Sequence, residues 1–223
     1  MKPLEEGEML AILAKDRVLR KYIKSLKPPV LSLSDDPYYS LLKAIVSQQL
    51  SVKAAATIWE RFLLLFEARY PGAEVLDMMP VEEVRLAGLS GQKAGYLKNI
   101  ASFHLQHPIS LEVLVTMSDE AIIDHLTQIK GVGRWTVEML LMFSLGRMDV
   151  FPVDDLGIKS KMIRLYNIQI LESKEIKKEL FRIAEKWKPC RSLACHYLWH
   201  IPNRAGLKWS GQDLGFNFFI SSC

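Results

Sequence analysis

The chain has 223 residues, 49% of them hydrophobic and 24% charged, a composition typical of one large globular domain or two small ones. The longest apolar stretches, such as residues 139–145, are far shorter than the ~20 residues of a membrane-spanning helix, and the acidic N-terminus does not resemble a secretory signal, so a soluble, non-exported protein is expected. The net charge of +4 permits a polyanionic partner without demanding one, and the spacing of Cys190, Cys195 and Cys223 supports neither a zinc nor an iron–sulfur site.

Apolar residues recur at spacings of three and four along almost the whole chain, whereas alternating β-strand patterns are nearly absent, so the predicted fold class is all-α. A first helix is expected over residues 9–23. Ser34, Asp35 and Asp36 are expected to cap a second helix that opens with Pro37. Further helices are predicted over residues 51–66, 75–79, 81–87, 92–104, 119–129, 134–145, 155–166, 173–187 and 191–201, with Ser110 and Ser118 as caps.

Residues 126–140, LTQIKGVGRWTVEML, predict a helix, a tight glycine hairpin and a second helix. Gly131 and Gly133 are expected to adopt backbone conformations closed to residues with a Cβ. Such a turn lets a phosphate oxygen approach the amides at the start of the second helix. A glycine-x-glycine pattern alone is more typical of a plain turn between packed helices, and that alternative stays open here.

Three blocks of the sequence together resemble the helix-hairpin-helix DNA glycosylases of base excision repair, in particular the alkylation-repair members of the 3-methyladenine DNA glycosylase II type. The blocks are residues 45–51, the hairpin of residues 126–140, and the segment of residues 150–159, which contains a proline and two aspartates. They occur in the family's order and belong to a resemblance that spans at least residues 37–200. The resemblance implies a two-lobed, all-α fold with the active site in the cleft between the lobes.

The resemblance also implies the extent of each lobe. The central lobe would run over residues 37–146 and contain the helix-hairpin-helix at 119–145. The second lobe would combine residues 1–36 with residues 147–223 and carry the catalytic aspartate; the tail from residue 205 shows no clear period and is expected to pack irregularly. Relatives with an added β domain before the helical core are longer, so a compact version without it is expected.

Either of two adjacent aspartates matches the family's catalytic residue. In the family this aspartate caps a helix, with an apolar residue three positions later and a long residue after that. Counting from Asp155 reaches Ile158 and Lys159, whereas counting from Asp154 reaches Gly157. Asp155 is therefore the predicted catalytic carboxylate, which would stabilise an oxocarbenium ion and orient or deprotonate water. A plain helix cap is the alternative for this pair.

The residue after the hairpin predicts the type of chemistry. Family members that also cut the strand have a lysine nucleophile where this chain has Trp135, so hydrolysis by water and an intact abasic product are expected. Trp135 resembles a tryptophan of 3-methyladenine glycosylases, and stacking on a cationic alkylpurine contributes ~0.5–2 kcal/mol. Trp199 aligns with a second tryptophan of the pocket, although taken alone a tryptophan at this position is more typical of a buried core residue. Met139 stands where some relatives have a tyrosine, which leaves the preferred lesion open.

The remaining site residues are expected to contact DNA. Gln49, or alternatively Leu50, would fill the gap left by the extruded base, although a polar helix end is as typical of this sequence. Lys93 is the candidate phosphate contact in a second glycine turn, residues 88–94. The resemblance further assigns DNA contacts to Gly131, Val132, Gly133 and Thr136. It also assigns a structural Na+ or K+ to the carbonyls of Thr127, Ile129 and Val132, with no cofactor required for chemistry.

The sequence thus predicts a monomeric, monofunctional DNA glycosylase that flips alkylated purines out of double-stranded DNA and excises them. The alternatives are a glycosylase for uracil, an oxidised base or a mismatched base, and a helix-hairpin-helix module that binds DNA without chemistry. The expected location is the cytoplasm, at the nucleoid, in a prokaryote or the nucleus in a eukaryote. The rank order of alkylated bases is left open.

Overall fold

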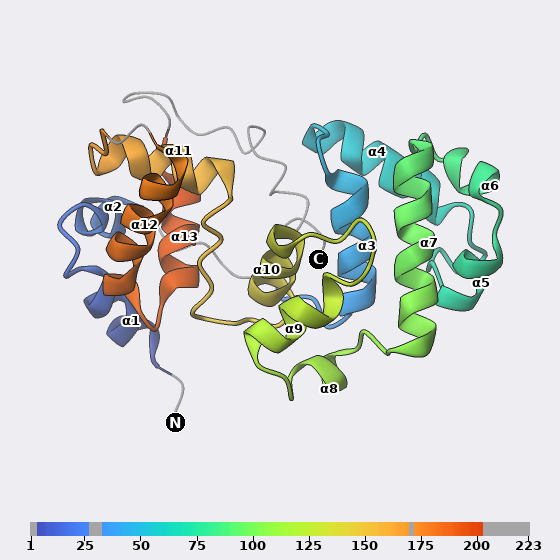
Figure 1. Cartoon of the computed structure of the whole chain (residues 1–223), viewed down its shortest axis with the longest axis horizontal. Coiled ribbons are helices and arrows are strands. Elements are labelled where there is room, and N and C mark those ends of the chain that lie inside the picture. Colours follow the sequence, from blue (N-terminus) through green and yellow to red (C-terminus); the bar gives the residue numbers. More distant parts are fainter. Residues whose placement is uncertain (1–3, 27–32, 170–171, 203–223) are drawn as a thin grey trace. The chain divides into compact units, whose positions relative to one another are not determined.

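The computed structural model describes residues 4–26, 33–169 and 172–202. Within these ranges every regular element is a helix, either α or 3-10, which confirms the predicted all-α class. The described residues form two compact units: residues 33–146, called the hairpin unit, and residues 4–26 with 147–202, called the terminal unit (Figure 1). The irregular tail expected from residue 205 lies outside the described residues.

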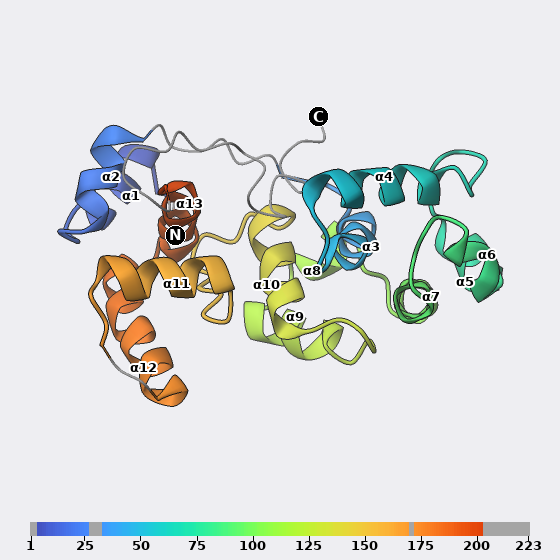
Figure 2. The ribbon, with the colours of Figure 1, turned by 90° about the horizontal axis from the view of Figure 1, so that it is seen from above.

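The hairpin unit is built around α7 and α3. Helix α7 packs against α3 on one side and against the short helices α5 and α6 on the other (Figures 1 and 2). Helix α3 also contacts α4 and α10, and its residues Leu41, Leu42 and Ile45 are fully buried in the core. The helices of this unit are α3 (Pro37–Ser47), α4 (Val52–Leu63), α5 (Ala73–Met78), α6 (Val81–Arg85), α7 (Gly91–Gln106), α8 (Leu111–Leu114), α9 (Asp119–Leu126) and α10 (Arg134–Phe143).

Short polar side chains cap four of the eight described helices of the hairpin unit. The Asp36 carboxylate accepts a 2.9 Å hydrogen bond from the amide of Tyr39, and Pro37 takes the first position of α3, where a missing N–H costs nothing. Ser110 is the N-cap residue of α8, as predicted, but its side chain makes no capping hydrogen bond. The capping hydroxyls of α4, α7 and α9 are those of Ser51, Ser90 and Ser118.

The terminal unit is organised around α13. This helix packs against α11 and α2, while α1 contacts α2 and the 3-10 helix η1. The single helix expected over residues 9–23 is wrong, because the chain forms two helices with a break between them. The elements are α1 (Glu6–Leu13), α2 (Leu19–Ser25), α11 (Leu156–Leu165), α12 (Ser173–Ala184), η1 (Glu185–Trp187) and α13 (Arg191–His200).

The break between α1 and α2 is explained by Asp16, whose carboxylate is buried. One oxygen accepts hydrogen bonds from the amides of Val18 and Leu19 at 2.8 and 3.2 Å, which satisfies donors at the start of α2. The other accepts from the Tyr166 hydroxyl at 2.9 Å and the Trp187 indole at 3.1 Å. A buried carboxylate needs such donors, and the two aromatic donors are distant in sequence, so periodicity alone predicts one continuous helix here.

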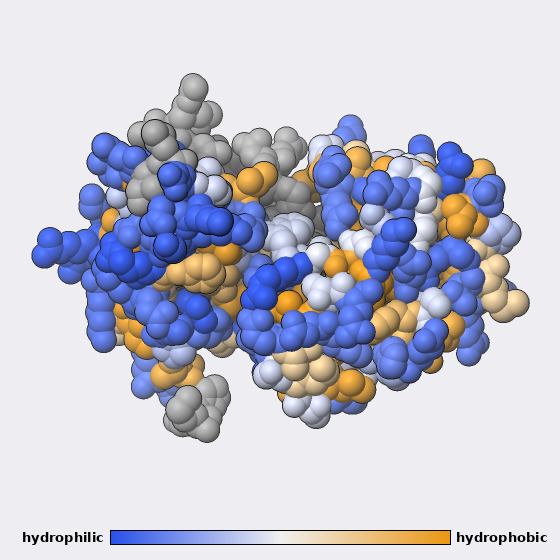
Figure 3. All heavy atoms as spheres, in the orientation of Figure 1, coloured by the Kyte–Doolittle hydropathy of each residue, from blue (hydrophilic) through white to orange (hydrophobic). Residues whose placement is uncertain are grey.

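On the face drawn in Figure 3, hydrophilic side chains cover most of the described surface and apolar residues form smaller patches. None of the described helices has both the length and the apolar character needed to cross a lipid bilayer. Among the exposed apolar residues is Leu156, whose side chain is 81% exposed at the first position of α11. An apolar side chain therefore stands at the surface directly after the predicted catalytic aspartate.

Candidate active site and DNA-binding residues

The two neighbouring aspartates have different environments. Asp155 is the N-cap of α11, and its Oδ1 accepts a 2.8 Å hydrogen bond from the amide of Ile158. Asp155 is 7% exposed, whereas the side chain of Asp154 is 53% exposed and pairs with the Lys177 ammonium at 2.6 Å. Asp155, and not Asp154, therefore caps the helix, with the apolar Ile158 three positions later, as the choice of Asp155 required. The catalytic role of Asp155 stays a prediction.

Trp199 of α13 holds the Asp155 carboxylate. Its indole N–H donates a 3.0 Å hydrogen bond to the same Oδ1 atom that caps α11, and the tryptophan is buried. The two residues are 44 positions apart, so the packing of α13 on α11 brings them together. Two donors fix the orientation of this carboxylate. The predicted base contact of Trp199 stays a prediction, and its indole also orients the Asp155 carboxylate.

Lys161 supports the same arrangement from the next turns of α11. Its ammonium is buried and donates a 2.7 Å hydrogen bond to the Trp199 carbonyl. Burial lowers the pKa of Lys161 to about 8, and the negative charge of Asp155 opposes part of that change. The sequence does not single out Lys161, because a lysine on an amphipathic helix is typical of a solvent-exposed face.

Replacing Trp199 by phenylalanine is expected to lower the single-turnover rate of base release about tenfold, because a hydrogen bond to a charged group contributes ~1.5–3 kcal/mol. Affinity for DNA should change little. Trp59→Phe is a matched control: this buried indole donates at 3.1 Å to the Tyr39 hydroxyl in the hairpin unit, with no carboxylate involved. An equal loss of rate in both variants would argue against a positioning role.

His196 lies beside this cluster, with its ring centroid 5.4 Å from that of Trp199. Burial lowers the pKa of His196 from 6.5 to about 4, so the folded protein holds the neutral ring. The unfolded chain takes up a proton as the pH falls below about 6.5, and the folded chain does so only near 4.

The free energy of unfolding is therefore expected to be highest above pH 6.5 and to fall by up to about 3 kcal/mol toward pH 4. Urea unfolding across this range measures the effect. His196→Gln should flatten the profile, and the same change at the exposed His107 should leave it steep. A wild-type profile that is already flat between pH 6.5 and 4 would contradict the prediction.

The predicted hairpin lies between α9 and α10, and its two glycines differ. Gly131 has φ of +107°, and a Cβ added there would lie 2.2 Å from the ring of Tyr96. Gly133 is the N-cap of α10 with φ of −97° and ψ of 165°, and a Cβ there would meet nothing within 4 Å. The prediction that both glycines adopt conformations closed to other residues is correct for Gly131 and wrong for Gly133, because an N-cap takes ordinary extended backbone.

The other predicted hairpin residues are mostly buried. The amide of Val132 donates to the Ile129 carbonyl at 3.0 Å, so the phosphate donors expected at this turn remain the amides of Gly131 and Gly133 and those of the first turn of α10. Thr136 is buried, and its hydroxyl accepts from the Gln48 side chain at 3.4 Å, which joins α10 to the end of α3. The predicted DNA contacts of Val132 and Thr136 therefore have little side-chain surface to use.

Arg134 joins the two hairpin helices, a role that sequence analysis missed. Its guanidinium makes two hydrogen bonds to Glu120 of α9, at 2.6 and 3.0 Å, and one to Glu138 of α10 at 3.1 Å. The i,i+4 spacing of Arg134 and Glu138 is the one local signal. Trp135 follows at the second position of α10 and is half-buried. Met139, predicted to contact the base, is fully buried in the core of the hairpin unit.

The predicted intercalating turn connects α3 with α4. Gln49 is exposed and has φ of +59°, whereas Leu50 is half-buried. The Lys93 ammonium donates to the carbonyls of Val46 and Gln48 at 2.8 and 2.6 Å. Lys93 thus holds the C-terminal end of α3 in place, and burial lowers the pKa of its side chain. Of the two candidates, Gln49 is the more exposed, and Lys93 supports the turn that carries it.

Comparisons with known proteins agree with this fold. The family model for the HhH-GPD superfamily base excision DNA repair proteins matches residues 42–189. The chain is 38% identical over 183 residues to DNA-3-methyladenine glycosylase 1 of Schizosaccharomyces pombe, covering 81% of this chain and 79% of that protein. The structure of the 3-methyladenine DNA glycosylase of that yeast in complex with abasic DNA has a TM-score of 0.79 at 35% identity, covering 91% of this chain and 100% of that one. A DNA-3-methyladenine glycosidase of Bacillus halodurans has a TM-score of 0.76 at 34% identity, covering 87% and 88%.

Proposed function

The chain belongs to the HhH-GPD superfamily of base excision DNA repair proteins, and we propose that it excises alkylated purines of the 3-methyladenine class from double-stranded DNA by hydrolysis. The observation that carries the proposal is the carboxylate of Asp155, which is held at the start of α11 by the Trp199 indole and the Ile158 amide. The relatives named 3-methyladenine DNA glycosylases support the substrate class.

The proposed reaction begins with extrusion of the damaged nucleotide from the duplex. Gln49, on its exposed turn, fills the gap in the base stack and offsets part of the cost of unstacking. The bond between the sugar and the purine breaks, and the bonding electrons leave with the base. Asp155 stabilises the positive charge that develops on the sugar and orients the water that adds to it. The products are a free base and an intact abasic site.

Trp135 determines two features of this proposal. An indole cannot form a Schiff base, so a tryptophan directly after the hairpin supports hydrolysis over strand cleavage. An electron-rich indole face also favours a stacked cationic purine, such as one alkylated at N3 or N7. That Trp135 and Asp155 act on the same extruded nucleotide is part of the proposal.

A monovalent cation at the hairpin, Na+ or K+, is proposed with carbonyl ligands from Thr127, Ile129 and Val132. Carbonyl oxygens suit hard cations. The Ile129 carbonyl accepts one hydrogen bond, from the Val132 amide, and a carbonyl oxygen has a second lone pair for an ion. Bound there, the ion would stabilise the hairpin, and the hydrolysis itself would require no cofactor.

Replacing Trp135 by alanine is expected to slow release of cationic 3-methyladenine about tenfold more than release of neutral hypoxanthine, because cation–π stacking contributes ~0.5–2 kcal/mol. Single-turnover rates on duplexes with each lesion measure the difference. Trp135→Phe, which keeps an aromatic face, should lie between alanine and wild type. Equal losses for both lesions would remove the stacking argument.

The proposed function is tested by mass spectrometry of the bases that the protein releases from methylated double-stranded DNA. Alkylated purines should appear in the supernatant while the DNA strand stays intact until alkali cleaves the abasic sites. Release of uracil or 8-oxoguanine in their place, from duplexes that contain them, would assign another lesion. DNA binding with no base release from any of these substrates would leave a binding module without chemistry.

A further inference from the structure

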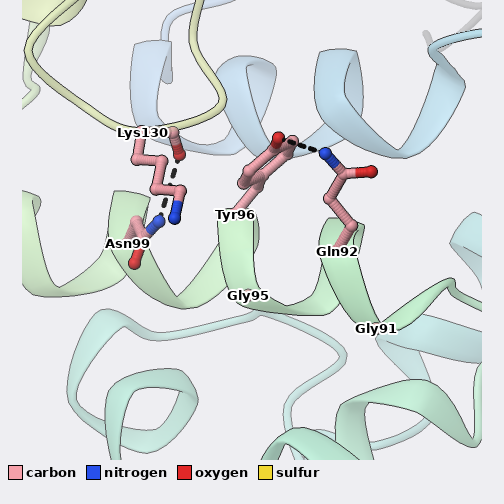
Figure 4. A pocket seen from close by; sticks show the side chains of 6 residues that line it. All are labelled: Gly91, Gln92, Gly95, Tyr96, Asn99 and Lys130. Carbon is pink, nitrogen blue, oxygen red and sulfur yellow. Dashed lines mark hydrogen bonds between the residues drawn. The ribbon is translucent and has the colours of Figure 1, made fainter.

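A pocket of about 330 Å³ lies in the hairpin unit next to the glycine turn. One wall is a face of α7, and the other is the last residue before the hairpin glycines (Figure 4). The residues lining it are Gly91, Gln92, Gly95, Tyr96, Asn99 and Lys130. We refer to it as the α7 pocket.

The lining of the α7 pocket is rich in hydrogen-bond donors and contains no carboxylate. Gln92 donates to the Tyr96 hydroxyl at 2.6 Å, so the phenol keeps its own proton for donation to a ligand (Figure 4). Lys130 is exposed and adds a positive charge. This set of groups suits a negatively charged oxygen ligand.

Gly95 has no structural requirement to be glycine. It lies in the interior of α7, without a positive φ, and a Cβ there would meet nothing within 4 Å. Glycine in a helix interior is less stable than alanine, so this position carries a cost to the fold. Gly131, by contrast, requires glycine for both its φ and its contact with Tyr96. At Gly95 the missing side chain leaves the pocket open, which points to a ligand there.

The α7 pocket is also connected to the hairpin. The Tyr96 ring packs directly against Gly131, and the Asn99 side chain donates to the Lys130 carbonyl at 3.1 Å. A ligand in the pocket therefore contacts the residues that set the position of the glycine turn. Because the turn amides are expected to grip one DNA phosphate, the ligand that fits both charge and location is a neighbouring part of the same backbone.

We propose that the α7 pocket binds a second phosphodiester of the DNA strand that the hairpin holds. The proposal rests on the proposed function in that it takes DNA as the partner. It assigns the contact in this region to Lys130, Tyr96 and Gln92. Lys93, the residue predicted from sequence, has its ammonium bonded to the end of α3.

The first test uses fluorescence anisotropy of an undamaged duplex at several KCl concentrations. Gly95→Ala should raise the midpoint of thermal unfolding by a few degrees yet weaken DNA binding severalfold, a combination that a structural glycine does not produce. Lys130→Gln should reduce the slope of log affinity against log salt by ~0.9, the value for one phosphate contact. Lys178→Gln on α12, whose side chain is 75% exposed, removes the same charge elsewhere and should leave affinity unchanged. Wild-type affinity in both Gly95→Ala and Lys130→Gln would overturn the proposal.

The second test locates the phosphate. Neutral methylphosphonates placed one at a time along the strand should weaken wild-type binding at a hairpin position and at a second, neighbouring position. Gly95→Glu should lose the response at the second position and keep the first, while Gly95→Gln, of the same size, should bind more tightly than Gly95→Glu. Identical responses of wild type and Gly95→Glu at every position would overturn the assignment.

A binding measurement with inorganic phosphate tests whether the pocket takes a free phosphate ion in place of a DNA phosphodiester. If it binds wild type but not Gly95→Glu, and both bind DNA equally, the pocket takes a free anion and the DNA assignment is wrong. These measurements need no base release, so their failure is distinguishable from a failure of the glycosylase proposal, which is measured on methylated DNA.

Discussion

Asp155→Asn is expected to reduce base release at least about 100-fold, in line with the loss of one electrostatic stabiliser of a transition state. Asparagine caps helices about as well as aspartate, and its carbonyl oxygen accepts from the same donors, the Ile158 amide and the Trp199 indole. The fold and the site geometry should therefore survive. What is lost is the negative charge opposite the developing cation.

The measurement is the single-turnover release of 3-methyladenine from a duplex, with DNA affinity determined in parallel. Affinity for the lesion should be retained or increased. Asp154→Asn is the matched control, because that exposed carboxylate pairs with Lys177 and caps no helix. Wild-type release by Asp155→Asn would show that the chemistry belongs to another group. An equal loss in Asp154→Asn would show that the effect is not specific to Asp155.

Gly131→Ala is expected to destabilise the protein by about 2 kcal/mol or more, since a side chain at positive φ is strained and the added methyl must displace the Tyr96 ring. Displacing the ring also moves the turn, so DNA affinity should fall about tenfold or more, a change of ~1.4 kcal/mol. Urea unfolding and anisotropy with undamaged DNA measure the two effects.

Gly133→Ala serves as the control in the same turn. Its backbone is extended and its surroundings are open, so neither strain nor a clash is expected, and the loss of glycine's advantage over alanine at an N-cap should cost only ~0.5–1 kcal/mol, less than the change at Gly131. A large destabilisation at Gly133 with little effect at Gly131 would reverse the assignment of the two glycines.

Whether a sequence prediction is correct depends on how far apart in the sequence the interacting residues lie. The caps at Asp36 and Ser118 are hydrogen bonds between residues three positions apart, and the sequence predicts them correctly. The split of the first helix depends on Asp16, whose aromatic partners are 150 and 171 positions away. The hydrogen bonds of Asp16 to the Val18 and Leu19 amides are local, but no local pattern contains the two aromatic donors that keep its carboxylate satisfied when buried.

The features of the candidate site also divide into those that follow from neighbouring residues and those that depend on tertiary contacts. The sequence alone determined that the fold is helical, that a glycine hairpin joins two helices, and that Asp155 stands at a helix start, because each is a property of neighbouring residues. Only the tertiary structure placed the Trp199 indole on that carboxylate, Lys161 behind Trp199, and the α7 pocket beside the hairpin. Those contacts join segments tens of residues apart, and helix packing, which the periodicity of one segment does not specify, brings them together.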